Sequence, residues 1–286
     1  MGRYNKILVA VGGSKAGWNA LRQSFKLASD EKMWITALAI NPPYLGDIDL
    51  VGISNIEDVL EGKGREVLEE AQKIAAGEKA SIKTRLAEGE PFEKIIEIAE
   101  EENCDLIVMG RRAMSDVERA LMGSVTAKVI GHFKGRMLIV PEDTVLGWQD
   151  ILLAYDGSKY SDVALSEAIN YAKSYGGSLK IVNVVYTNDE FIANAPDVVE
   201  KMVMKARETL EVARDKAVKE GVKAEIFVRE GEPYDAITSL AGELKTSTIF
   251  MGSRGRTKLR RILMGSVAAR VIGHSPCPVM VINREI

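Results

Sequence analysis

Residues 151–158 read ILLAYDGS, a continuous apolar run that ends in an acidic residue, a glycine and a serine. An uninterrupted apolar run of this length is typical of a strand buried on both faces, and the serine can cap a following helix. Residues 7–14 read ILVAVGGS and repeat the pattern. The two stretches therefore predict the same strand–turn–helix unit twice in one chain.

Self-similarity continues along the chain. The matching segments are EGEPF at 88–92 and EGEPY at 230–234, IVMG at 107–110 and IFMG at 249–252, MGSV at 122–125 and 264–267, and VIGH at 129–132 and 271–274. The offset is 144 residues at the first match and 142 at the later ones, far longer than a solenoid repeat. The length of 286 residues suits two domains, which we place at 1–142 and 149–286.

Each half reads as strands alternating with helices. In the second half we expect strands at 151–155, 179–185, 224–228, 248–251 and 278–282, and helices at 158–175, 197–220, 233–244 and 266–273. Strands separated by helices imply a parallel sheet with helices on both faces, so the fold class is α/β, with two tandem doubly wound open five-stranded sheets. Segments 41–55 and 187–195 are expected to be loops that could act as lids.

Composition limits the partners and the location. Lys and Arg number 38 against 41 Asp and Glu, so the net charge is −3 and neither nucleic acid nor a membrane surface is expected as a partner. No apolar run approaches the roughly 18–20 residues needed to span a bilayer, and residues 1–13 do not show the longer apolar region and cleavage site of a secretory signal, so none is expected. Cys104 and Cys277 lie in unrelated contexts, which argues against a disulfide and favours the cytoplasm.

The loops after the first and fourth strands hold the unusual residues of the second half. Ligands of open parallel sheets bind at the carboxyl ends of strands, where strand order reverses. The fourth strand ends in Met251-Gly252-Ser253-Arg254-Gly255, and nine residues later Gly265-Ser266 opens a helix. Glycines can adopt positive φ and let backbone amides approach an anion closely. The free amides at the helix start favour phosphate, and so does the positive charge of Arg254, Arg256 and Lys258. The alternative is that the glycines serve tight turns and the arginines form a solvated face.

The chain resembles a tandem universal stress protein over both halves. The pattern Gly252-x2-Gly255-x9-Gly265-Ser266 matches that family's ATP-binding signature, supported by Asp-Gly-Ser at 156–158. The resemblance implies strand order 3-2-1-4-5, pairing through the fifth strands, and ATP, ADP or AMP held with Mg²⁺ or Mn²⁺. It implies that Asp156 lies near the nucleoside and that Val184 or Val185 contacts adenine through its backbone. The resemblance assigns phosphate binding to Gly252, Arg254, Gly255, Gly265 and Ser266. It implies that Met251 and Val267 line the pocket.

The first half departs from this pattern. Gly12 stands in place of the aspartate, and Arg112 and Ala113 stand in place of Arg254 and Gly255, although Gly110, Gly123 and Ser124 remain. Alanine is unfavourable where positive φ is needed, and its Cβ can block a phosphate. We therefore expect a degenerate nucleotide motif in the first half, kept for assembly or regulation.

Catalytic machinery is not recognisable in the sequence. His132 and His274 end equivalent helices, where a histidine can satisfy terminal carbonyls. No catalytic residue is assigned and the metal ligands stay open, so any ATP hydrolysis should be slow. The leading hypothesis is a stress-response regulatory protein that binds ATP in its second half and contacts unidentified proteins. The chain would act as an intramolecular pseudo-dimer or assemble further into a homodimer. The alternatives are a nucleotide-independent interaction module and a nucleotide hydrolase.

Overall fold

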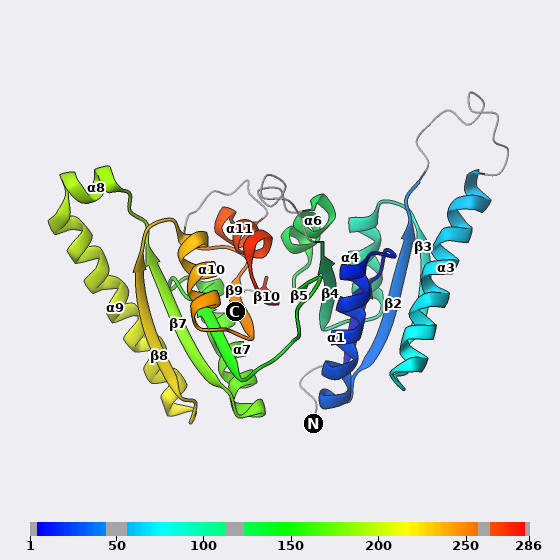
Figure 1. Ribbon diagram of the computed structural model, residues 1–286, viewed down its shortest axis with the longest axis horizontal. Helices are drawn as coiled ribbons and strands as arrows, with labels where there is room; N and C mark the ends of the chain where they lie inside the picture. The colour runs from blue at the N-terminus through cyan, green and yellow to red at the C-terminus, as the bar shows by residue number, and fades with distance from the viewer. Residues whose placement is uncertain (1–4, 44–55, 113–122, 257–263, 284–286) are drawn as a thin grey trace. The chain divides into compact units, whose positions relative to one another are not determined.

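The computed structural model describes residues 5–43, 56–112, 123–256 and 264–283 (Figure 1). Its contacts divide the chain into two compact units. Unit 1 holds the described residues up to 112, with 123–133 and 140–143, and unit 2 holds 134–139 and 144 onward. The units do not coincide with the sequence repeats, because residues 134–139 of the first repeat belong to unit 2. The domain boundaries 1–142 and 149–286 therefore remain a prediction.

The first repeat contains alternating strands and helices. Its elements are β1 (Lys6–Ala10), α1 (Lys15–Glu31), β2 (Trp34–Asn41), α3 (Ile56–Gly77), β3 (Lys83–Glu88), α4 (Pro91–Glu101), β4 (Leu106–Arg111), α6 (Ser124–His132) and β5 (Arg136–Pro141). The strand order is β3-β2-β1-β4-β5. Strands β1 to β4 pair in parallel, and the predicted order 3-2-1-4-5 is therefore confirmed.

The second repeat follows the same plan. Its elements are β6 (Asp150–Ala154), α7 (Lys159–Tyr175), β7 (Ser178–Val185), α8 (Asp189–Asn194), α9 (Pro196–Lys219), β8 (Ala224–Glu230), α10 (Pro233–Glu243), β9 (Thr248–Gly252), α11 (Ser266–His274) and β10 (Val279–Ile282). The order β10-β9-β6-β7-β8 is again 3-2-1-4-5 read from the other edge. Helix α8 was expected to be a loop; it begins after Asn188, whose side chain caps it by accepting a hydrogen bond from the Phe191 amide (2.8 Å).

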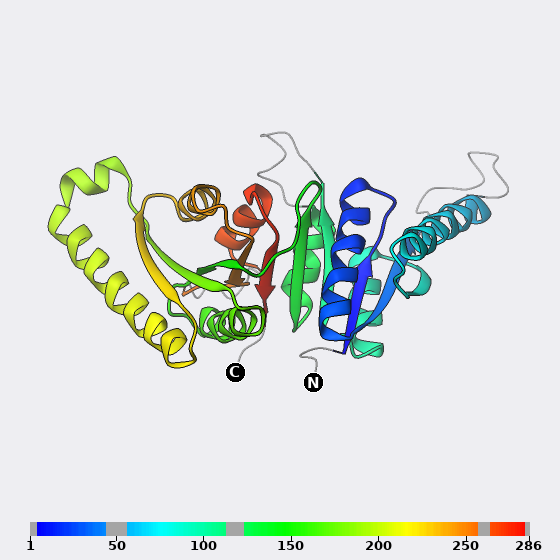
Figure 2. The ribbon, with the colours of Figure 1, turned by 60° about the horizontal axis from the view of Figure 1, so that its bottom comes forward.

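Local chemistry explains the first helix of each repeat. Ser158 caps α7 by accepting a hydrogen bond from the Ser161 amide (3.3 Å), and Ser14 caps α1 by accepting one from Gly17 (3.2 Å). Gly176 ends α7 with φ of 65°, a left-handed conformation that glycine adopts without penalty. Helix α7 packs on β6 and β9, and α9 packs on β7 and β8. Figure 2 shows α9 and α10 on opposite sides of β7 and β8, so the predicted helices on both faces are present.

The fifth strands of the two repeats pair with each other, as predicted. Strand β10 runs antiparallel to β5, with Val279 opposite Ile139 and Ile282 opposite Arg136. These residues of β5 belong to unit 2, although β5 comes from the first repeat in sequence. The Arg136 guanidinium also forms an ion pair with Glu167 of α7. The first repeat thus supplies a strand to the core of the second.

Within the described residues, no helix is long and apolar enough to cross a membrane.

Candidate functional site

The predicted site residues of unit 2 gather at the carboxyl ends of three parallel strands. Asp156 follows β6 by two residues, and Val184 and Val185 end β7. Gly252 ends β9, and Ser266 is the first residue of α11. Because β6 lies between β7 and β9, the three strand ends meet at one edge of the sheet.

Asp156 joins the loop after β6 to the loop after β9. Its Oδ1 accepts a hydrogen bond from the Ser158 amide (3.0 Å) within its own turn. Its Oδ2 accepts one from the Arg256 amide (3.1 Å), 100 residues away. The carboxylate therefore fixes the position of one loop against the other.

The glycines of the signature do not have the backbone conformation expected of them. Positive φ falls on Gly157 (75°), and the positive-φ glycines do not include Gly252, Gly255 or Gly265. Gly252 instead allows close packing, because an added Cβ would lie 2.6 Å from the Tyr160 Cβ at the start of α7. Gly110 packs in the same way in unit 1, where an added Cβ would lie 2.6 Å from the Gly17 amide nitrogen. The close approach of strand to helix explains this pair of glycines in both repeats.

The amino end of α11 closes on the β9 loop. The Gly265 amide donates to the Ser253 carbonyl (2.9 Å), and an added Cβ on Gly265 would lie 3.6 Å from the Arg254 Cα. The N-cap residue Gly265 has no side chain to cap the helix, whose first intrahelical bond runs from the Ala269 amide to the Gly265 carbonyl (3.1 Å). The amides of the exposed Ser266 and its neighbour Val267 therefore lead the helix without intrahelical acceptors.

Strand β7 extends past the end of β6 and presents a backbone edge. The Val182 carbonyl accepts from the Tyr155 amide on the β6 side (2.8 Å), and the Val185 carbonyl accepts from the Gly231 amide on the β8 side (3.1 Å). Alternate residues of a strand bond to opposite neighbours, so Val184 directs its amide and carbonyl toward the β6 side, beyond Ala154. Val184 thus offers a donor and an acceptor beside Asp156.

Arg254 and Met251 are more enclosed than the sequence suggests. The Arg254 guanidinium donates to the Tyr160 hydroxyl (3.1 Å) and lies 5.6 Å from the centre of that ring. Met251 is buried in β9, and Val267 is half-buried. Beneath the site, burial raises the pKa of Tyr155, and a hydrogen bond from its hydroxyl to the Asp162 carboxylate (2.7 Å) adds to the effect. Tyr155 is therefore protonated at neutral pH.

Sequence reasoning overlooked Tyr160 and the side chain of Thr209. Tyr160 holds Arg254, and Thr209 of α9 lies 3.2 Å from the position of a Cβ on Gly157. Neither residue belongs to a recognisable motif, because both act through contacts between elements distant in sequence. Arg256 was noted only as a source of charge, yet its backbone amide is the group that Asp156 binds.

The corresponding edge of unit 1 has no carboxylate for this bridge, because Gly12 stands in place of Asp156. A Cβ on Gly12 would meet no atom of the described residues within 4 Å, and Gly13 has a positive φ (74°), as Gly157 does. Asn41 stands in place of Val185, and Gly64 of α3 leaves room for its amide. Ala113, for which positive φ was expected to be unfavourable, lies outside the described residues. Its counterpart Gly255 has no positive φ, so that argument was wrong at Gly255.

The two histidines occupy the predicted helix ends. His132 Nδ1 lies 2.7 Å from the Lys128 carbonyl, and His274 Nδ1 lies 2.8 Å from the Arg270 carbonyl. His274 also packs against the Tyr234 ring, with centroids 5.0 Å apart. Across the described ranges, no group of three or more His, Cys, Asp or Glu side chains is arranged to hold a metal ion.

The fold and the site define a class: doubly wound α/β proteins with a glycine-bearing loop after the fourth strand. The model of the universal stress protein family matches residues 3–141 and again 147–283, and the chain belongs to that family. Universal stress protein YxiE of Bacillus subtilis is 35% identical over 147 residues, covering 46% of this chain and 97% of that protein. Universal stress protein MJ0531 of Methanocaldococcus jannaschii is 33% identical over 142 residues, covering 48% of this chain and 83% of that protein.

A solved structure matches both repeats at once. The crystal structure of a universal stress protein from Archaeoglobus fulgidus aligns with a TM-score of 0.76 and 30% identity. The alignment covers 98% of this chain and 97% of that one. The tandem arrangement therefore occurs in a solved member of the family.

Proposed function

We propose that the second repeat binds ATP, or a related adenine nucleotide, at the carboxyl ends of β6, β7 and β9. Binding would regulate contacts with other proteins in a cytoplasmic stress response, with at most slow hydrolysis. The observation that carries this proposal is the convergence of three kinds of group at one sheet edge. These are the Val184 backbone, the Asp156 carboxylate and the uncapped start of α11.

Each kind of group suits one part of the nucleotide. Val184 offers the alternating donor and acceptor that the edge of adenine requires, and Asp156 can accept from a ribose hydroxyl. The leading amides of α11 and the Ser266 hydroxyl suit phosphate oxygens. Three or four charge-assisted hydrogen bonds at about 1.5–3 kcal/mol each, together with burial of the base, are sufficient for micromolar binding after the cost of association.

A divalent metal fits this site as a companion of the phosphates. Because the described residues hold no ready cluster of metal ligands, the nucleotide itself would supply most of the oxygen ligands. Mg²⁺ or Mn²⁺ would neutralise phosphate charge when bound. The residues of the chain would bind and orient the nucleotide.

The test is to denature freshly purified protein, identify the released small molecules and count them per chain. We expect about one adenine nucleotide per chain, and calorimetric titration with ATP and Mg²⁺ should show one site. Both signals should be lost in Asp156→Ala/Gly255→Val. The matched control is Gly12→Ala in the first repeat, where a Cβ meets none of the residues that the structure describes within 4 Å, and it should leave the count unchanged.

A nucleotide-independent interaction module is the second candidate. It is favoured by the packing of Gly252 against Tyr160, which explains that glycine without any ligand. Release of no nucleotide, with no heat on titration, would replace the first proposal by this one. Two nucleotides per chain would instead show that the first repeat also binds.

A further inference from the structure

Where the loops after β6 and β9 meet, a glycine of each loop lies beside a charged side chain of the other. A Cβ on Gly255 would lie 2.7 Å from Oδ2 of Asp156, and a Cβ on Gly157 would lie 2.8 Å from an Nη of Arg256. Real Cβ atoms essentially never approach other atoms so closely. The Gly157 contact can be relieved, because Arg256 is exposed and its guanidinium ends a flexible side chain, and the φ of 75° already accounts for a glycine at 157. The Asp156 carboxylate is short and held by two backbone amides, so its contact with position 255 is the one that excludes a side chain.

The backbone does not require glycine at position 255. Gly255 is exposed and does not have the positive φ that favours glycine. Of the described residues outside its immediate chain neighbours, an added Cβ would meet only the Asp156 carboxylate within 4 Å. Asp156, which accepts the Arg256 amide one residue further on, is thus the group that excludes a side chain at 255.

The first repeat carries the two replacements together. Gly12 stands in place of Asp156, and Ala113 stands in place of Gly255. Where the carboxylate is absent, a methyl group is present at the partner position. This is the pattern expected if the two positions depend on each other.

We propose that Asp156 and Gly255 act as one positioning unit, which holds the β9 loop in place through the Arg256 amide before any ligand binds. The absence of a side chain at Gly255 then leaves space for the Asp156 carboxylate, on the nucleoside side of the site, rather than for a phosphate. The consequence for recognition rests on the proposed nucleotide function, whereas the loop contact joins two groups of the chain itself.

A double-mutant cycle tests the consequence for binding. Affinities for ATP, ADP, AMP and adenosine are measured by calorimetry on wild type, Gly255→Ala, Asp156→Ala and the double variant. Because the methyl displaces the carboxylate, we expect Gly255→Ala to weaken all four ligands by the same factor, about tenfold or more. The double variant should bind no more weakly than Asp156→Ala alone. A loss that grows with the number of phosphates and adds fully to that of Asp156→Ala would overturn the proposal.

Amide proton exchange measured by NMR on the ligand-free protein tests the contact itself. The Arg256 amide should exchange several-fold faster in Asp156→Ala and in Gly255→Ala than in wild type, with the Tyr155 amide, bonded to Val182 in the sheet, as the unchanged reference. Equal exchange of the Arg256 amide in all three proteins would overturn the proposal. If wild type binds no adenine nucleotide, the proposed function fails, and this exchange measurement alone decides whether the two residues are coupled.

Discussion

At the residue scale, Gly252 shows how a signature glycine can serve packing. Gly252→Ala would place a methyl 2.6 Å from the Tyr160 Cβ and 2.9 Å from its carbonyl carbon, so β9 and α7 must separate. We expect a loss of about 1–3 kcal/mol in the free energy of unfolding, measured by urea denaturation. The matched control is Gly242→Ala in α10, where a Cβ meets nothing within 4 Å and alanine should stabilise the helix by up to about 1 kcal/mol. Equal shifts in both variants would contradict the packing role.

Cys104 lies at the turn between α4 and β4, where it is 8% exposed. Burial raises the pKa of its thiol from 9.0 to about 11, and the charge of Glu102 adds to the effect. The Cys104 thiol is therefore protonated at pH 8, and its alkylation should require unfolding of the protein. We expect labelling of Cys104 by iodoacetamide, located by mass spectrometry, to rise with the urea unfolding curve. Rapid labelling of the native protein would show that this turn opens locally.

At the element scale, the sequence predicted most strands and helices to within a few residues. Helix α11 was expected at 266–273 and spans Ser266–His274, since glycine and histidine mark its end in both repeats. Helix α8 was missed because its six residues depend on one Asn188 cap. The members of the site were predictable, but the bridge from Asp156 to Arg256 was not. It joins residues 100 positions apart through a loop conformation that no local pattern specifies.

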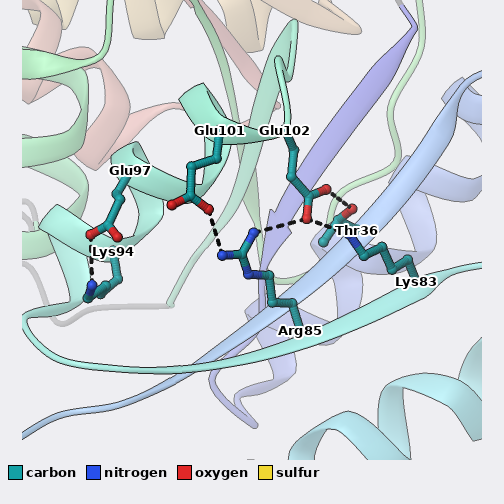
Figure 3. A network of polar contacts seen from close by, with 7 residues as sticks. All are labelled: Thr36, Lys83, Arg85, Lys94, Glu97, Glu101 and Glu102. Carbon is teal, nitrogen blue, oxygen red and sulfur yellow. Dashed lines mark hydrogen bonds and ion pairs between the residues drawn. The ribbon is translucent and has the colours of Figure 1, made fainter.

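A network of charges ties β2, β3 and the end of α4 together in unit 1 (Figure 3). Glu102 accepts from Thr36 Oγ1 (2.7 Å) and lies within 2.7 Å of Lys83 Nζ and 3.2 Å of an Arg85 Nη. Burial alone would raise the pKa of Glu102, but the hydrogen bonds from Lys83, Thr36 and Arg85 outweigh it and lower the pKa. The Glu102 side chain is 9% exposed, whereas Lys83 is 64% and Arg85 33% exposed, so these contacts are only partly shielded from solvent.

Glu102→Gln should therefore destabilise the protein by about 1–3 kcal/mol at pH 7, measured by thermal or urea unfolding. Because the folded pKa lies below the ordinary value of 4.5, this stabilisation is present above pH 4.5 and is lost as the pH falls through the folded pKa. Glu101→Gln is the matched control, since Glu101 is 48% exposed and should contribute less than about 1 kcal/mol. A difference between Glu102→Gln and wild type that does not shrink as the pH is lowered below 4.5 would contradict this role of the Glu102 charge.

At the scale of the whole molecule, the repeats are joined by β5, which the first repeat contributes to unit 2. Its partner β10 is buried along its whole length, with Val281 opposite Met137 of β5 and Met251 of β9. A bare apolar edge strand is an aggregation hazard, and the pairing of β5 with β10 covers one such edge with another. Duplication of the domain within one chain thus gives each fifth strand a fixed partner.

Val281→Lys places a charge in this pairing. The side chain of Val281 is 1% exposed, and burial of an unpaired ammonium should cost several kcal/mol and weaken the β5–β10 ladder. We expect Val281→Lys to have a lower melting temperature than wild type. In hydrogen–deuterium exchange, the amides of residues 137–139 should exchange faster in the variant than in wild type, and this increase should be larger than that in β7. Val212→Lys is the matched control, because Val212 on α9 is 57% exposed and the same substitution there should change stability by less than about 0.5 kcal/mol. If Val281→Lys left both stability and β5 exchange at wild-type values, the two repeats would not depend on this strand pair for their union.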